Sequence, residues 1–114
     1  MIRLLIVAFA SAVLGCSASA ASIPDSEASS HIGQTVTLDC NVASIHASGG
    51  GTTFVNCGAP YPRQNASLVV FAGRNVGNLQ QYQGRHLLVR GTLKLYKDRP
   101  EIVLDSAAQI QRPH

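Results

Sequence analysis

The chain of 114 residues contains little of what enzymes use for catalysis. Its six acidic residues are scattered, so no group of carboxylates is placed to hold a metal ion and activate water. The glycines at 49 to 51 join two expected strands and open no helix, which excludes a phosphate-binding loop. Three cysteines without ligand-spaced histidines argue against zinc. We therefore expect a protein that is not an enzyme and uses no metal or cofactor.

The sequence also lacks an apolar run long enough to cross a membrane as a mature helix. The longest run, Leu4 to Gly15, has about a dozen residues and follows one positive charge at Arg3, which is typical of a secretory signal peptide. We expect residues 1–15 to be this signal. The protein is then exported, as a periplasmic or membrane-anchored protein of a bacterium.

Two processing sites remain open for this signal. The sequence Val13-Leu14-Gly15-Cys16 resembles a bacterial lipobox, in which Cys16 is lipidated and acyl chains hold the protein on the membrane. Alternatively, Ala18-Ser19-Ala20 is an A-x-A site that releases a soluble protein. We favour the lipobox because the apolar run ends directly at Gly15-Cys16.

The remainder divides into a tether and one domain. Residues 16–31 are small and polar with a single proline, so we expect a flexible tether. Residues 32–111 are enough for one domain that can bury only a modest core, and we expect a monomer. With Cys16 lipidated or removed, Cys40 and Cys57 remain as an even pair in an oxidising compartment. We therefore expect a Cys40–Cys57 disulfide.

One hairpin register accounts for most of the segment from Gly84 to Asp105. Opposite charges face each other on one side and aliphatic residues on the other if a two-residue turn lies at Lys97-Asp98. The resulting pairs are Tyr96 with Arg99, Lys94 with Glu101, Leu93 with Ile102 and Arg90 with Asp105. In a first hairpin, a turn at Ser48-Gly49 places Cys40 across from Cys57 and Val42 across from Val55.

The alternation of apolar and polar residues predicts an all-β domain with one short helix. The expected strands are Gln34 to about Ala47, Thr52 to Cys57, Ala66 to Ala72, Arg85 to Tyr96 and Arg99 to about Asp105, with a helix at Asn75 to Gln83 and a possible extension at Ala107 to Ile110. Three strands, a short helix and two strands are the element order of the OB-fold, a five-stranded Greek-key barrel with its helix between strands three and four.

Three segments carry a resemblance to a known family. They are Thr53-Phe54-Val55-Asn56, Tyr61-Pro62 and GTLKLYKDRPEI at 91–102. Over about residues 34–110 the chain resembles small bacterial OB-fold domains grouped with nucleic-acid-binding modules of the tRNA-anticodon-binding type. The resemblance implies an OB fold and points toward nucleic-acid binding, although OB barrels carry many functions. Cys40 and Cys57 depart from the intracellular pattern and suit an exported protein.

Charge and aromatic residues identify the expected contact surface. Residues 17–60 contain no Lys or Arg, whereas residues 61–114 contain eight basic and three acidic residues, so a phosphate backbone would be attracted there. Part of that charge serves cross-strand pairing, which leaves Arg63, Arg74, Arg85, Lys97 and Arg99 unpaired. The candidate residues for binding single-stranded nucleic acid are Phe54, Asn56, Tyr61, Arg63, Tyr96, Lys97 and Arg99.

A second hypothesis stays open beside this one. Aromatic residues make up only 5% of the chain, which is few for a protein that stacks bases, and export removes it from most nucleic acid. The alternative is an envelope stress or interaction protein that binds a small ligand or a protein partner with the same loops.

Overall fold

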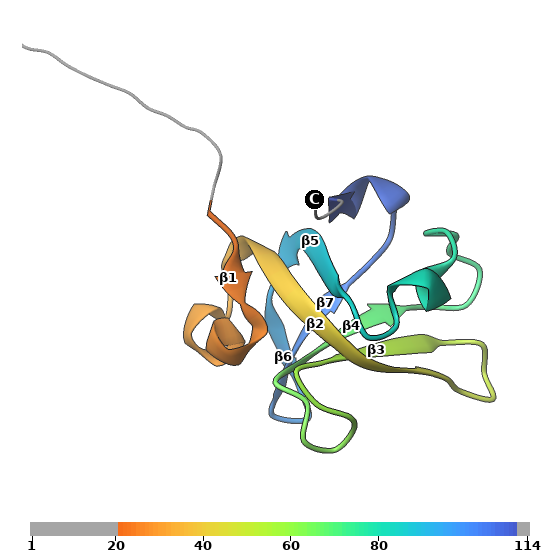
Figure 1. Cartoon of the computed structure of the whole chain (residues 1–114), viewed down its shortest axis with the longest axis horizontal. Helices are drawn as coiled ribbons and strands as arrows, with labels where there is room; N and C mark the ends of the chain where they lie inside the picture. Colours follow the sequence, from red (N-terminus) through yellow and green to blue (C-terminus); the bar gives the residue numbers. More distant parts are fainter. Residues whose placement is uncertain (1–20, 112–114) are drawn as a thin grey trace, which may run out of the picture.

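The computed structural model describes residues 21–111, which form a curled, mostly β structure (Figure 1). Over these residues the strands are β1 (Ile23–Pro24), β2 (Thr35–Ala47), β3 (Thr53–Cys57), β4 (Ala66–Val70), β5 (His86–Thr92), β6 (Lys94–Tyr96), β7 (Arg99–Val103) and β8 (Ile110–Gln111). The three short 3-10 helices over the same residues are η1 (Asp25–His31), η2 (Leu79–Tyr82) and η3 (Ala107–Gln109).

The strands form one curled sheet, a half-barrel, in the order β6-β7-β4-β3-β2-β5-β8, with β1 added in parallel beside β2. The expected closed five-stranded barrel is therefore wrong, because this path of hydrogen-bonded neighbours ends at β6 and β8. The expected strand from Arg85 to Tyr96 divides at Leu93: β5 pairs with β2, and β6 pairs with β7. The β4 and β7 pair is parallel, whereas β3–β4 and β6–β7 are antiparallel, so the sheet is mixed.

The core lies on the inner face of this curl. Alternate strand residues point inward, and the largest side chains that are fully buried are the leucines at 38, 68, 87, 93 and 104 together with Ile102. Removing such apolar surface from water is the main favourable term in folding a domain this small. The sheet's outer face is thereby left for other contacts.

The second hairpin confirms the predicted register near its turn. Tyr96 lies opposite Arg99 and Lys94 opposite Glu101. Lys97 and Asp98 have φ angles of 50° and 65°, the left-handed conformation that two-residue hairpin turns require. The expected pairing of Arg90 with Asp105 is wrong, because the division at Leu93 takes β5 away from β7.

The two residues of that rejected pair find other partners. Arg90 lies opposite Thr37 on β2, and its guanidinium donates to the Thr37 hydroxyl at 3.3 Å. Asp105 forms an ion pair with Arg74 at 3.7 Å, so Arg74 is not the unpaired cation that the sequence indicated.

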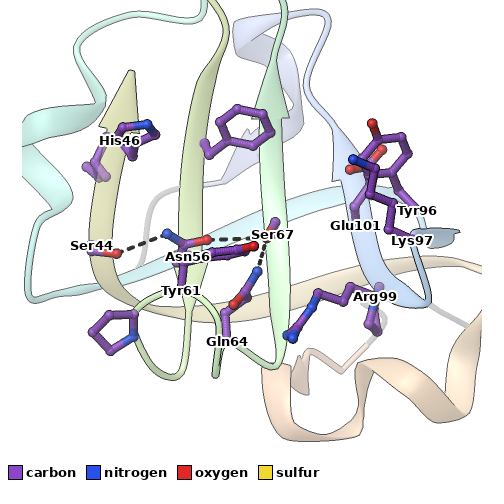
Figure 2. Close-up of a pocket in the computed structure, with 14 residues that line it drawn as sticks. Ser44, His46, Asn56, Tyr61, Gln64, Ser67, Tyr96, Lys97, Arg99 and Glu101 are labelled. Carbon is purple, nitrogen blue, oxygen red and sulfur yellow. Dashed lines mark hydrogen bonds between the residues drawn. The ribbon is translucent and has the colours of Figure 1, made fainter. Parts of the chain in front are cut away.

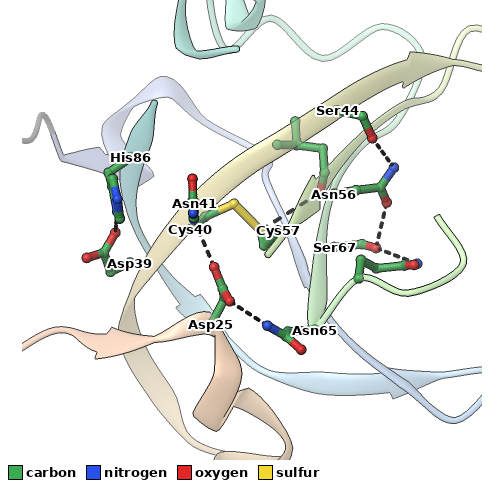
Figure 3. Close-up of a disulfide and its surroundings, with 12 residues drawn as sticks. Asp25, Asp39, Cys40, Asn41, Ser44, Asn56, Cys57, Asn65, Ser67 and His86 are labelled. Atoms are coloured by element: carbon green, nitrogen blue, oxygen red, sulfur yellow. Dashed lines mark hydrogen bonds and ion pairs between the residues drawn. A yellow bond between two sulfur atoms is a disulfide. The ribbon is translucent and has the colours of Figure 1, made fainter. Parts of the chain in front are cut away.

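The first hairpin contains the expected disulfide in a different register. Cys40 and Cys57 are bonded, with Cα atoms 5.0 Å apart (Figure 3). Cys57 lies opposite Val42, however, and the register shifts between Val42 and Ser44. The turn is wider than expected, since Ala47 pairs with Thr53 and Gly51 has a φ of 90°. The predicted opposition of Cys40 and Cys57 is therefore wrong, although their bond is confirmed.

The expected helix from Asn75 to Gln83 shortens to the single turn η2. Gly77 has a φ of 91°, which interrupts helical backbone, and the Asn78 side chain caps the turn by accepting from the Gln80 N–H at 3.0 Å. Val76 and Leu79 are buried, as their spacing indicated. The predicted burial of both side chains is therefore confirmed, but Val76 precedes the helix, so the predicted helical segment is wrong before Leu79.

Part of the expected tether is structured. Residues 23–31 form β1 and η1, where Asp25 and Ala28 are buried. The tether prediction is wrong for this part, because the Asp25 carboxylate accepts hydrogen bonds from the Asn41 N–H and the Asn65 amide, both at 2.8 Å. The expected signal peptide and the lipidation of Cys16 lie outside the described residues. Among those described, no helix is long and apolar enough to span a membrane.

Candidate functional site

A row of polar side chains crosses the outer face of the sheet. The register places Ser44 of β2 opposite Asn56 of β3, Asn56 opposite Ser67 of β4, Ser67 beside Glu101 of β7, and Glu101 opposite Lys94 of β6. The row lies on the outer face because the residues adjacent in sequence to its members, Val55, Leu68 and Ile102, are fully buried in the core. We call these five residues the polar row.

Hydrogen bonds link the neutral members of the polar row (Figure 2). The Asn56 amide nitrogen donates to Ser44 Oγ at 3.0 Å, and Ser67 Oγ donates to Asn56 Oδ1 at 3.4 Å. Gln64, from the 58–65 loop, donates from Nε2 to Ser67 Oγ at 3.3 Å. Asn56 and Ser67 are buried, so these bonds satisfy groups that water reaches poorly. Gln64 Oε1 is buried with no partner among residues 21–111.

Four members of the polar row, Ser44, Asn56, Ser67 and Glu101, form the floor of a cavity of about 700 Å³, and Lys94 does not line it. This volume lies within the range of pockets that enclose drug-sized ligands. Its other walls come from β2, β3, the 58–65 loop and the β6–β7 turn. The residues are Ile45, His46, Phe54, Pro60, Tyr61, Tyr96, Lys97, Arg99 and Pro100, with Gln64 beside the floor. The sheet register and two loops together therefore build this concave site.

Cations lie over aromatic rings at the rim of the cavity. The Arg99 guanidinium carbon is 6.0 Å from the centre of the Tyr61 ring, and Lys97 Nζ is 5.4 Å from the centre of the Tyr96 ring. Both distances fall within the range of cation–π attraction. Tyr61 is 72% exposed and Tyr96 is 54% exposed, so both rings offer free surface to a ligand.

Glu101 is an acid on the floor of this cavity. Glu101 is only 6% exposed. Its carboxylate lies 3.8 Å from Lys94 Nζ, and because the Lys94 side chain is more than half exposed, this ion pair is weak. Burial raises the pKa of Glu101 above its ordinary value of 4.5, while the charge of Lys94 lowers it by less. The site therefore combines a cationic and aromatic rim with a buried acidic group.

Replacing Glu101 by Gln is expected to raise the melting temperature by a few degrees at pH 7 and to leave it unchanged at pH 4. A carboxyl whose pKa is raised by folding binds its proton more tightly in the folded state. Its contribution is complete below 4.5 and is lost as the pH rises through the folded-state pKa. Glutamine stays neutral and avoids this loss. Thermal unfolding followed by circular dichroism measures the difference.

The matched control for this experiment is Glu27→Gln, which removes the same charge from an exposed position on η1. Its melting temperature at pH 7 should stay close to that of the wild type. An equal gain at both pH values for Glu101→Gln, or a loss at pH 7, would contradict the raised pKa.

The structure brings together six of the seven predicted site residues: Phe54, Asn56, Tyr61, Tyr96, Lys97 and Arg99 all line the cavity. Arg63 does not line it; its backbone N–H donates to the Pro60 carbonyl within the 58–65 loop. Sequence reasoning missed the floor residues Ser44, Gln64, Ser67 and Glu101. The available signal was the presence of polar residues at alternate positions in otherwise apolar strands, as with Ser67 in ASLVV.

Residues 21–111 contain no group of three or more His, Cys, Asp or Glu side chains that could hold a metal ion. Comparison of the sequence with protein-family models gave no match, and comparison with curated proteins gave none either. These comparisons therefore assign no family to the chain.

Proposed function

We propose that this protein is an exported OB-type module that binds single-stranded nucleic acid in the cavity, as a monomer and without catalysis. The observation that carries the proposal is the convergence of ring surfaces and cations at one site. Phe54, Tyr61 and Tyr96 offer rings on which bases can stack, while Lys97 and Arg99 offer charges for phosphates. These residues come from three segments that only the fold brings together.

The topology supports an OB relationship. If β5 and β6 are taken as one strand bent at Leu93, the chain has the strand order and the parallel β4–β7 pair of that fold. The cavity then lies against the second strand and beside the turn between the last two strands. OB-folds use this side of the sheet to bind oligonucleotides.

The disulfide favours a location outside the cytoplasm, because such bonds persist in oxidising compartments. We propose a periplasmic location, with a lipid anchor at Cys16 as the favoured means of attachment. Mass spectrometry of the mature N-terminus tests the anchor, and an unmodified start at Ala21 would reject it.

Fluorescence anisotropy with labelled single-stranded DNA and RNA tests the binding. We expect salt-sensitive binding that weakens at least tenfold in the double variant Phe54→Ala, Arg99→Ala, since each stacked base contributes about 1–3 kcal/mol. The control is Arg85→Ala, which removes an exposed cation that does not line the cavity. The absence of binding even at low ionic strength would reject the proposal.

Glu101 favours a second candidate, an envelope protein that binds a small ligand or a protein partner. A buried carboxylate repels phosphate, so a ligand without phosphates could use the cavity equally well. A thermal-shift screen with small aromatic amines and amides tests this candidate. A ligand that stabilises the wild type but not Phe54→Ala supports it, and no stabilisation by any of them rejects it.

A further inference from the structure

The floor of the cavity contains two acceptor groups that have no hydrogen-bond partner within residues 21–111, the Glu101 carboxylate and Gln64 Oε1. The polar groups of Asn56, Ser67 and Gln64 are already engaged in hydrogen bonds with one another and with Ser44. The Glu101 carboxylate does not take part: its one charged partner within residues 21–111 is Lys94, at a distance longer than a hydrogen bond. Gln64 Oε1, also an acceptor, is buried without a partner in the same part of the chain. A ligand that reaches this floor must therefore bring donors.

We infer that the cavity selects a guanine base, whose N1–H and exocyclic amine donate to the two carboxylate oxygens of Glu101. This inference rests on the proposed function and specifies which base the site prefers. Guanine presents two adjacent N–H donors on its Watson–Crick edge, and a carboxylate presents two acceptors side by side. Adenine, cytosine and thymine each present only one donor group on that edge with an acceptor next to it, so one carboxylate oxygen would face an acceptor instead of a second N–H.

The side chains around Glu101 suit a flat base whose Watson–Crick edge points toward the floor of the cavity. Arg99 lies two residues away on the same face of β7, Tyr96 lies opposite Arg99, and the Tyr61 ring lies beneath the Arg99 guanidinium. Figure 2 shows these side chains around the same cavity. A base held by its edge at Glu101 leaves its faces for the tyrosines and its phosphates for the exposed rim. The carboxylate then repels only phosphates that enter the cavity.

The test uses the full protein and four labelled heptanucleotides, all of deoxythymidine except for the central position. That position holds guanine, inosine, adenine or thymine, and a single guanine avoids quadruplex formation. At pH 8, the wild type is expected to bind the guanine strand about tenfold more tightly than the adenine strand, as a good bidentate contact discriminates. Inosine, which lacks the exocyclic amine, should fall between them.

Glu101→Gln is expected to reduce the guanine preference to about twofold or less, because an amide has one acceptor instead of two. Glu27→Gln, the same charge change at an exposed site, should keep the full preference. Both variants are first checked by circular dichroism for folding.

The outcomes separate the two proposals. If the wild type binds none of the four strands, the proposed function fails, and the base preference fails with it. If it binds all four equally, nucleic-acid binding stands and the guanine preference is overturned. A guanine preference that persists in folded Glu101→Gln likewise overturns the role of Glu101.

Discussion

Replacing Cys40 and Cys57 together by alanine is expected to lower the free energy of unfolding by about 3 kcal/mol, because the bond closes a loop with a sequence separation of 17. Both sulfurs are fully buried, so the variant also loses some packing. Small domains are marginally stable, and a loss of this size removes a large share of the total. Urea denaturation followed by circular dichroism measures it.

Reduction of the wild type separates the effect of the bond from that of packing, since both thiols remain in place. We expect the reductant to move the wild-type urea midpoint most of the way toward that of the double variant. The variant itself should not respond to the reductant. A wild-type midpoint that is unchanged after complete reduction would contradict a stabilising bond.

Replacing Asp25 by alanine is expected to lower the free energy of unfolding by about 2–3 kcal/mol, because hydrogen bonds to a charged group are strong and this carboxylate, which is buried, makes two of them. The carboxylate accepts from the Asn41 N–H and the Asn65 amide, and so joins η1 to β2 and to the 58–65 loop (Figure 3). Gly58 packs against it so closely that a Cβ there would lie 2.8 Å from Asp25 Oδ1. Urea denaturation measures the loss of stability.

Hydrogen exchange should locate the effect of Asp25→Ala. The amides of residues 25–41 and of the 58–65 loop are expected to lose protection first. Glu27→Ala removes an acidic residue from the same helix at an exposed position and should change little. If both variants cost the same, the loss would come from helix propensity or net charge, and the joining role of Asp25 would be rejected.

The parts of the fold that sequence reasoning predicted correctly depend on local chemistry. The β6–β7 register follows from a turn at Lys97-Asp98 and from charges that meet across it, all within a few residues. The cysteine pair follows from counting and from the compartment. Such signals need no knowledge of distant segments.

The errors arise where distant contacts decide the structure. Nothing near Leu93 indicates that the strand divides there, because the division depends on β5 pairing with β2, whose partner residues are some 50 positions earlier in the chain. Residues 23–31 have the composition of a tether and become ordered through Asp25, whose partners are 16 and 40 positions away. The wider first turn required Gly51 to adopt a left-handed conformation that Gly49 or Gly50 could equally have taken.

The rim of the candidate site was predictable and its floor was not. Tyr61, Tyr96 and Arg99 are recognisable as residue types that bind ligands and lie near turns. Glu101 was correctly paired with Lys94 and was therefore interpreted as a solvated charge. It is nevertheless only 6% exposed and lines the same cavity as residues of the 58–65 loop and the β6–β7 turn, and cross-strand pairing alone does not reveal that position.

The disulfide also affects the geometry of the cavity. Cys57 is the last residue of β3, and the next segment carries Pro60, Tyr61 and Gln64 to the cavity. The bond to Cys40 thus fixes the base of that segment, and a newly made chain with free thiols would hold it less firmly. If the cavity binds a ligand as proposed, reduction of this bond is therefore expected to weaken ligand binding as well as the fold.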